Sequence, residues 1–207
     1  TGVYLCKHKQ SAVTKNGKCY ENVILQDKTG TIDAKIWEPN SIGIEEFESL
    51  DYIDVVGDVT SFAGALQVSI KRARKVNEGE YNPADYLPAC KFDIETMFGE
   101  LMQFIKSVKN PYLSQLLSYY FEMDADLIKA FKHGSAAKNV HHGFIGGLLE
   151  HTLGVTRLCE YYSKAYPILN RDLLITSAIF HDVGKTKELS AFPQNDYTDD
   201  GQLLGHI

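Results

Sequence analysis

His181 and Asp182 are adjacent in the string "AIFHDVGKT", at the end of an apolar run, and Lys185 follows three residues later. An imidazole and a carboxylate are costly to bury unless they are paired or bound to a cation. His151 lies thirty residues before His181 in "GGLLEHTLGV", and His206 lies twenty-four residues after Asp182 in "GQLLGHI". The three histidines and the aspartate each border an apolar segment, and together they predict a divalent metal site built between helices.

Two expected helices, at residues 144–162 and 171–182, must bring these side chains together. Steps of three and four residues place His151 on a core-facing stripe of the first helix and His181 on such a stripe of the second. These stripes comprise Leu148, His151, Val155, Leu158 and Tyr162, and Leu174, Ala178 and His181. Asp182 lies about 100° around the helix from His181, which lets both reach one ion. A single core-facing histidine is more often a packing residue, but this combination favours ligation of Mn, Fe, Co, Ni or Zn.

The N-terminal part of the chain, residues 1–76, has the pattern of an all-β domain. Asn16-Gly17 is a hairpin turn signal, and the alternation of Ile32, Ala34 and Ile36 is typical of a half-buried strand. The expected strands are residues 3–14, 18–27, 31–37, 52–60 and 65–76, with a short helix at 39–50. Five strands with a helical insertion between the third and fourth predict an OB-fold, which is a small Greek-key barrel.

The chain changes character after the last expected strand. Residues 77–90 are polar with two prolines, and we expect a linker or a segment that wraps onto a domain. From residue 91 to 207 the periodicity is helical, which predicts an all-α domain. Its first three helices are expected around residues 98–108, 111–120 and 124–131.

The barrel offers candidate residues for nucleic-acid binding. OB-folds that bind single strands combine a positive groove with aromatic stacking platforms. The candidates are the aromatic Tyr20, Trp37 and Phe62 and the basic Lys71, Arg72, Arg74 and Lys75. Trp37 is opposite in phase to the core-facing side chains of its strand and should point outwards. Core packing is the commoner role for any one of these aromatics, and the basic run fits a solvated strand end as well as a phosphate-contacting edge.

Composition narrows the class of protein. A formal net charge of −6 argues against binding nucleic acid with the whole surface. The four cysteines, Cys6, Cys19, Cys90 and Cys159, are widely spaced without a CxxC pair, which fits a reducing cytoplasm. No apolar run approaches the roughly 18 residues that a membrane span requires. We therefore expect a cytoplasmic protein without a membrane partner.

His151, the His181-Asp182 pair and Lys185 resemble the HD superfamily of metal-dependent phosphohydrolases. The longer strings "HHGFIGGLLEHTLGV", "IFHDVGKTKEL" and "YTDDGQLLGHI", behind "LQDKTGTIDAKIW", are similar to the YhaM family of bacterial 3′-to-5′ exoribonucleases. That family joins an N-terminal OB-fold to an HD domain, which is the order expected here. The His-Asp pair alone is weakly specific, whereas the strings in this order are strongly specific and cover nearly the whole chain.

The resemblance implies a ligand set and a cofactor. His151, His181 and Asp182 match metal-ligand positions, with Mn²⁺ as the metal, and Lys185 matches a phosphate-facing lysine. His206 matches a later histidine that contacts a second metal or the substrate. A further aspartate ligand is expected beyond residue 207, so this stretch would be an incomplete HD domain. The resemblance also suggests assembly into a homo-oligomer.

The chemistry of the residues assigns roles within such a site. Asp182 could orient the attacking water as well as bind metal, and Lys185 could neutralise charge developing on the phosphate. His141 and His142 lie in a glycine-flanked loop, from which an imidazole could protonate the leaving oxygen, with an exposed loop as the alternative. Glu150 points off the stripe of its helix and should be solvated.

Three functions fit these expectations. The leading one is a metal-dependent 3′-to-5′ exoribonuclease whose barrel holds single-stranded RNA, or single-stranded DNA, while the helical domain releases 5′-mononucleotides. The second is an HD phosphohydrolase or phosphodiesterase for free nucleotides or cyclic dinucleotides. The third is a single-strand-binding module without catalysis.

Overall fold

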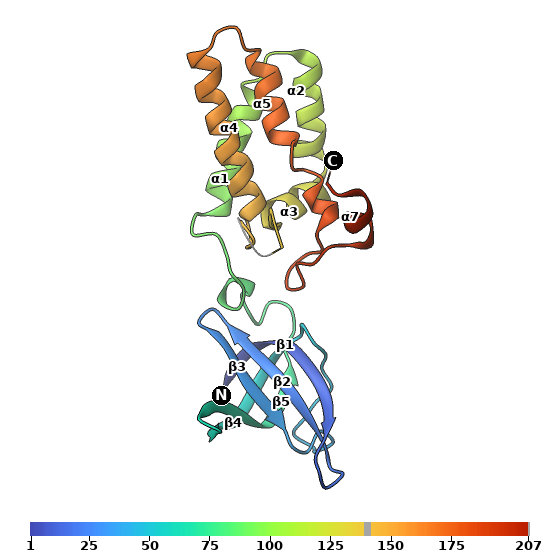
Figure 1. Cartoon of the computed structure of the whole chain (residues 1–207). Helices are drawn as coiled ribbons and strands as arrows, with labels where there is room; N and C mark the ends of the chain where they lie inside the picture. The colour runs from blue at the N-terminus through green and yellow to red at the C-terminus, as the bar shows by residue number, and fades with distance from the viewer. Residues whose placement is uncertain (139–141, 207) are drawn as a thin grey trace. The chain divides into compact units, whose positions relative to one another are not determined.

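The computed structural model describes residues 1–138 and 142–206 (Figure 1). Its internal contacts divide the chain into two compact units, Thr1–Leu87 and Pro88–Ile207. This division falls within the predicted linker at residues 77–90. None of the helices in the described part of the chain is long and apolar enough to cross a membrane.

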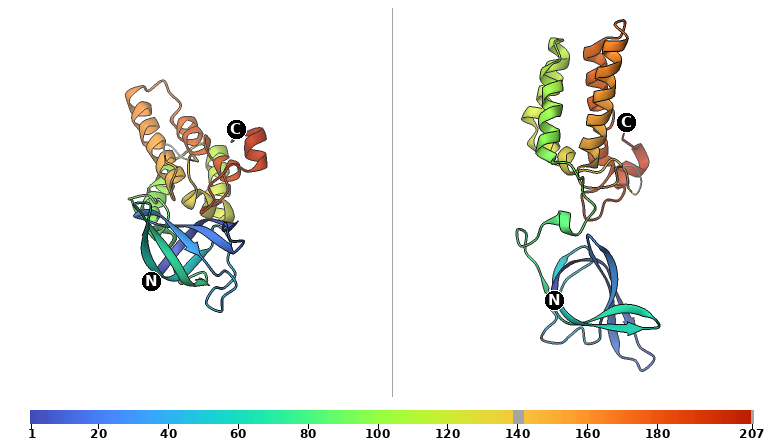
Figure 2. Two further views of the ribbon diagram at one scale, coloured as in Figure 1. Left: turned by 60° about the horizontal axis from the view of Figure 1, so that its bottom comes forward. Right: turned by 90° about the vertical axis from the view of Figure 1, so that its left-hand side faces the viewer.

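The first unit is a closed five-stranded barrel, seen end-on at the right of Figure 2. The strands follow the order β1-β2-β3-β5-β4 around it. The strands are β1 Gly2–Val13, β2 Cys19–Asp27, β3 Gly30–Ile36, β4 Tyr52–Phe62 and β5 Ala65–Lys75. β1 pairs antiparallel with both β2 and β4, and β3 runs parallel to β5. This order is that of the OB-fold Greek key, so the predicted fold of the barrel is confirmed.

Alternating side chains of the strands fill the barrel. Val23 and Leu25 of β2 and Ala34 and Ile36 of β3 are almost fully buried. Trp37 follows β3 in the opposite phase and is 46% exposed, as its position in the alternation predicts.

The segment at residues 39–50 is not the helix that the sequence suggested. It consists of turns and irregular backbone, with a parallel bridge between Ile44 and Ala73 of β5. Phe47 is buried in the barrel core, and the backbone at Gly43 approaches β5 so closely that an added Cβ would lie 2.9 Å from the Lys71 carbonyl oxygen. Packing against β5 therefore determines the conformation of residues 39–50, and it outweighs any local helix propensity.

The segment after β5 wraps onto the barrel. It contains a short 3-10 helix, η1 Pro83–Asp85. The backbone N–H of Lys28 donates to the Asp85 carbonyl at 2.7 Å, and the Gln26 amide donates to the Tyr86 carbonyl at 2.9 Å. Tyr81 stacks on Tyr52, with ring centroids 3.7 Å apart. These contacts attach the segment to the first unit.

The regular elements of the second unit are helices, apart from the isolated bridges Ala89–Ile145 and Leu189–Tyr197, among its described residues. Its elements are α1 Ile94–Lys106, α2 Pro111–Ser118, η2 Tyr119–Met123, α3 Ala125–His133, α4 Gly147–Ala165, α5 Arg171–Phe180, α6 Lys185–Glu188 and α7 Asp199–Leu204. Asp93, Asn110 and Asn170 begin α1, α2 and α5 with side chains that accept hydrogen bonds from the first turn. α4 packs against both α1 and α5, and it lies beside α5 in Figure 1.

The buried face of α4 is rotated from the predicted stripe. Leu149, Thr152, Leu153 and Thr156 are buried together with Leu148, whereas Leu158 and Tyr162 are 58% and 49% exposed. The Thr156 hydroxyl donates to the Thr152 carbonyl, so this side chain can be buried although it is polar. Because Thr152 and Thr156 are polar, a hydrophobicity pattern does not identify this face as the buried one. The rotation of the buried face places His151 at the edge of the core.

Candidate metal centre

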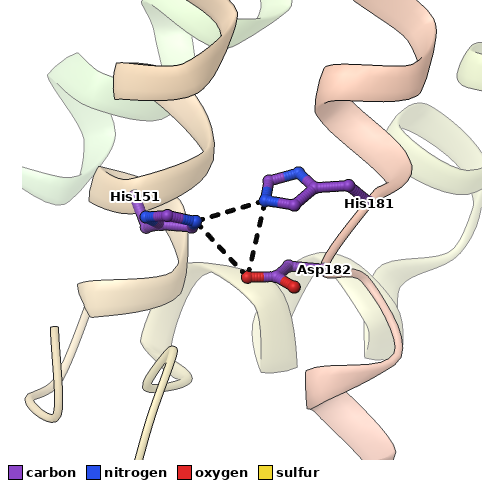
Figure 3. Close-up of side chains that lie close together, drawn as sticks. All are labelled: His151, His181 and Asp182. Carbon is purple, nitrogen blue, oxygen red and sulfur yellow. Dashed lines mark hydrogen bonds and ion pairs between the residues drawn. The ribbon is translucent and has the colours of Figure 1, made fainter. Parts of the chain in front are cut away.

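α4 and α5 bring His151, His181 and Asp182 to one point (Figure 3). His151 lies in the second turn of α4, His181 is the C-terminal cap of α5, and Asp182 follows it. One ligand atom from each side chain lies within 4.8 Å of the other two. Segments thirty residues apart in sequence therefore meet as the spacing predicts.

The three side chains converge through their potential ligand atoms. The Nε2 atoms of His151 and His181 are 3.2 Å apart, and the Asp182 Oδ2 atom lies 3.4 Å and 3.5 Å from them. Burial lowers the pKa of His151, which favours its neutral form. A neutral imidazole and a carboxylate are in the protonation states that metal ligation requires.

The orientation of His181 fits a metal ligand. Its Nδ1 atom lies 2.7 Å from the Ala178 carbonyl oxygen, where an N–H must donate. In the neutral imidazole, this hydrogen bond places the proton on Nδ1 and leaves the Nε2 lone pair directed at the other two ligand atoms. Histidines that bind metal usually have their second ring nitrogen held in this way.

His206 joins the cluster from beyond α7 and links it to Lys185. Its Nε2 atom lies 3.3 Å from the Asp182 Oδ1 atom, and its Nδ1 atom lies 3.0 Å from the Glu188 Oε2 atom. The same Glu188 oxygen lies 2.9 Å from the Lys185 Nζ atom. Burial alone would raise the pKa of Glu188, but Lys185 and His206 outweigh it and the pKa is lowered. An ionised Glu188 therefore connects the lysine to the histidine.

Sequence reasoning missed Glu188, although it lies in the string "IFHDVGKTKEL". It is three residues after Lys185 on a helix of one turn, and only 7% of it is exposed. A lysine and a glutamate at this spacing are neighbours on a helix and usually mark a solvated face. The burial comes from the segment around α7, which cannot be foreseen from the local pattern.

Two glycines allow the backbone to close around the cluster. A Cβ at Gly184 would lie 1.9 Å from the His206 carbonyl oxygen, and one at Gly147 would lie 2.0 Å from the His142 carbonyl oxygen. Neither contact leaves room for a side chain. These glycines therefore determine how closely the segment that carries His206 approaches α6 and how closely the segment that carries His142 approaches α4.

His142 lies near the cluster but does not contact the Asp182 carboxylate among the described interactions. Its ring centroid is 5.4 Å from that of His151, and its Nδ1 atom is 3.8 Å from the Glu150 Oε1 atom. Its Nδ1 atom is buried and forms no hydrogen bond with any described residue. The neighbouring His141 lies outside the described residues.

The expectation of a solvated Glu150 is wrong. The Cys90 thiol donates to the Glu150 Oε2 atom at 2.8 Å, and the side chain is 25% exposed. The segment before α1 covers this side of α4, since the Cys90 N–H donates to the Ile145 carbonyl and the Ile145 N–H donates to the Pro88 carbonyl, which forms a parallel bridge between Ala89 and Ile145. A helical wheel of α4 alone cannot show this cover.

The environment of Cys90 predicts an unreactive thiol. Burial and the hydrogen bond to Glu150 raise the pKa of Cys90 to about 11. Because the thiolate is the nucleophile, we expect iodoacetamide at pH 8 to alkylate Cys90 at least about tenfold more slowly than the exposed Cys19. Mass spectrometry of timed digests measures both rates, and equal rates would contradict the Cys90–Glu150 contact.

The barrel brings two of its predicted aromatic residues together. Tyr20 and Trp37 are stacked with ring centroids 5.2 Å apart, and the Lys35 Nζ atom lies 5.1 Å from the Tyr20 ring. The register that pairs Glu21 with Ile36 places Tyr20 opposite Trp37 when continued by one residue. Phe62 is 69% exposed and ends β4, rather than lying in the loop as expected.

The predicted basic run is largely neutralised by carboxylates of β4 and its surroundings. Lys71 pairs with Asp58 at 2.6 Å and Lys75 with Asp51 at 2.7 Å. Arg74 lies near Asp54 and Glu80. Arg72 has no ion-pair partner among the described residues. A phosphate-contacting edge therefore has less free positive charge here than the sequence suggests.

Residues 148–207 match the family model for the HD domain. The helical unit contains an HD domain. The match begins just before His151 and includes His181, Asp182, Lys185 and His206. All four of these residues lie in or beside the cluster described above.

Curated relatives extend the similarity across the barrel as well as the HD domain. The chain is 34% identical over 204 residues to the 3′-5′ exoribonuclease YhaM of Geobacillus sp. (strain WCH70), with 98% of the chain and 62% of that protein covered. It is 33% identical over 205 residues to YhaM of Bacillus subtilis (strain 168), with 98% and 64% covered. The chain thus spans less than two thirds of the length of these relatives.

A solved OB-fold domain is similar to part of the chain at a low score. The second OB-fold domain of replication protein A from Methanococcus maripaludis is 19% identical and covers 38% of the chain and 84% of its own length, with a TM-score of 0.29. The OB-fold assignment therefore rests on the strand order and register.

Proposed function

We propose that this chain is the RNA-binding and metal-binding part of a 3′-to-5′ exoribonuclease that hydrolyses single-stranded RNA. The observation that carries the proposal is the cluster of His151, His181 and Asp182 within an HD domain, in a chain similar to YhaM over almost its whole length. The products would be 5′-mononucleotides, and single-stranded DNA is a second substrate class.

The cluster fits a divalent cation, for which we propose Mn²⁺. Two imidazoles and one carboxylate form a mixed ligand set that suits such a metal. Bound there, the cation would lower the pKa of a bound water towards about 7 and polarise a phosphoryl oxygen. His151, His181 and Asp182 would hold it, with the Ala178 carbonyl fixing the ring of His181.

The remaining residues of the site position the substrate and move protons. Lys185 offers a point charge to the phosphate, which it reaches by leaving Glu188. His142 has a buried Nδ1 atom without a described hydrogen bond, so it can hold the proton that the leaving oxygen requires. Asp182 and His206 share a contact of 3.3 Å that orients the second carboxylate oxygen.

The stacked pair on the barrel supports binding of single strands. Trp37→Ala should weaken binding of a single-stranded RNA by about five- to hundredfold, because base stacking on an aromatic contributes about 1–3 kcal/mol. Fluorescence anisotropy at one fixed salt concentration measures the dissociation constant. Tyr112→Ala removes an aromatic that is 81% exposed on α2 and serves as the control. Equal affinities of both variants would argue that the Tyr20–Trp37 pair does not bind RNA.

A direct assay tests the proposed function. Single-stranded RNA labelled at its 5′ end is incubated with the full-length protein, with Mn²⁺ or with a chelator, and the products are resolved on a gel. A ladder shortening from the 3′ end that depends on Mn²⁺ is the expected result. Intact RNA together with turnover of free nucleotides would favour the phosphohydrolase, and RNA binding without any hydrolysis would favour the binding module.

A further inference from the structure

A cavity of about 560 Å³ adjoins the metal cluster between α1 and α4. His151 lines it, so that one side chain borders both the cavity and the cluster. The size falls in the range of small-molecule sites, and the walls are mainly apolar with a few polar groups, as such sites require. Phe92, Met97 and Leu153 provide apolar wall.

The charges of the cavity limit what it can hold. Three carboxylates line it, those of Asp93, Glu100 and Glu150, and Arg157 is the one arginine or lysine in the described lining. Arg157 pairs with Glu100 and donates two hydrogen bonds to its carboxylate, of 2.7 Å and 2.6 Å. Asp93 thus has no lysine or arginine partner in the wall, and the basic side chain nearest to Glu150 there is the imidazole of His142, 3.8 Å away. A phosphate would meet like charge there, whereas a neutral group with hydroxyls would meet acceptors.

Glu150 is the carboxylate beside the metal ligand His151. Its Oε2 atom is occupied by the Cys90 thiol, and its Oε1 atom lies 3.8 Å from His142, beyond hydrogen-bond distance. Since a carboxylate offers about four acceptor sites, the Oε1 atom can accept a hydrogen bond from a hydroxyl in the cavity.

We propose that this cavity holds the 3′-terminal nucleoside of the substrate strand, and that Glu150 accepts a hydrogen bond from its free 3′-hydroxyl. This subsite rests on the proposed function. The terminal nucleoside is the one nucleoside of a strand that carries no phosphate on its 3′ side, so it is the part that the acidic wall admits. Phe92 is 63% exposed and supplies an aromatic face for the base. A cavity of this charge explains why hydrolysis begins at an end.

Oligonucleotides that end in a 3′-hydroxyl or in a 3′-phosphate test the role of Glu150. The full-length protein with Mn²⁺ should degrade the oligonucleotide with a 3′-hydroxyl more than about tenfold faster than the one with a 3′-phosphate. The reason is that a 3′-phosphate would lie next to the Glu150 carboxylate, and two like charges in contact near a protein surface repel each other strongly. Glu150→Gln keeps the shape but removes the charge, and it should reduce the preference to less than about threefold. Glu122→Gln, at an exposed position of η2, should leave the preference unchanged.

Filling the cavity provides a second test. Gly154 lines it, and a Cβ there would meet nothing within 4 Å, so Gly154→Leu should occupy the space without disturbing α4. We expect at least about tenfold slower degradation of both ends, with Mn²⁺ affinity and circular dichroism unchanged. Gly99→Leu is the matched control, since Gly99 is also open on its helix and lies outside the described lining of this cavity.

Calorimetry separates failure of the subsite from failure of the function. With Mn²⁺ present, adenosine 5′-monophosphate should bind more tightly than adenosine 3′,5′-bisphosphate, and Glu150→Gln should remove this difference. If RNA is degraded but neither the rates nor the affinities depend on the 3′ group, the subsite is refuted and the function stands. If RNA is not degraded, the proposed function fails, and the two affinities still decide whether the cavity rejects a 3′-phosphate.

Discussion

His181→Ala should lower the affinity for Mn²⁺ by at least about 100-fold and abolish RNA hydrolysis. Mutation of a residue that only hydrogen-bonds to a metal ligand typically lowers metal affinity about 10–100-fold. His181→Ala removes a ligand itself, whose Nε2 atom lies 3.2 Å from His151 Nε2 and 3.5 Å from Asp182 Oδ2, so its effect should be at least as large. The His181 side chain is 35% exposed, so its loss should change the free energy of unfolding of the metal-free protein by less than about 1 kcal/mol. Electron paramagnetic resonance of free Mn²⁺ measures the affinity, and thermal unfolding in chelator measures the stability.

Controls for His181→Ala come from both units. His8→Ala removes an exposed histidine of β1 and should change neither metal affinity nor activity. RNA binding should persist in His181→Ala, because the stacked pair lies in the barrel. A variant that still binds Mn²⁺ like the unmodified protein would show that the three side chains do not form the metal site.

Gly184→Ala should disrupt the same site without touching a functional side chain. The backbone of Gly184, with φ of −59°, is accessible to alanine, so the obstacle is the His206 carbonyl oxygen 1.9 Å from the new Cβ. His206 must move, and its contacts with Asp182 and Glu188 are lost. We expect the free energy of unfolding to fall by about 1–3 kcal/mol, as for other overpacked positions, and hydrolysis to fall at least about tenfold.

Gly99→Ala is the appropriate comparison for this substitution. A Cβ on Gly99 meets nothing within 4 Å, and alanine in the interior of α1 should stabilise the protein by about 0.5–1 kcal/mol. Chemical denaturation measures both variants. A Gly184→Ala protein as stable and as active as Gly99→Ala would contradict the close approach of His206 to α6.

The barrel could be predicted from sequence because its signals are local. The Asn16-Gly17 turn and the alternation in β3 depend on neighbours within a few residues, and both predicted the observed strands. The conformation of residues 39–50 could not be predicted, because Ile44 and Phe47 are held by β5 and the barrel core. The neutralised basic run is a similar case, since the carboxylates that pair with Lys71 and Lys75 lie on or beside another strand.

The metal cluster was predictable to the extent that its residues end or border helices. His151 and the His181-Asp182 pair lie on two consecutive helices, so their side chains are expected to meet if these helices pack together. α4 and α5 do pack together, and the three side chains meet. The roles of Glu188 and Glu150 were hidden because each is covered by a segment distant in sequence. Glu188 is covered by the residues around α7, and Glu150 by the segment that carries Cys90.

A chain of contacts from Asp182 through His206 and Glu188 ends at Lys185. If a bound anion attracts Lys185 away from Glu188, Glu188 keeps only its contact with His206. The electrostatic potential at the Asp182 carboxylate, which His206 contacts, then changes as well. Occupancy by an anion and occupancy by a cation are therefore thermodynamically linked, and each must alter the affinity of the other by the same factor.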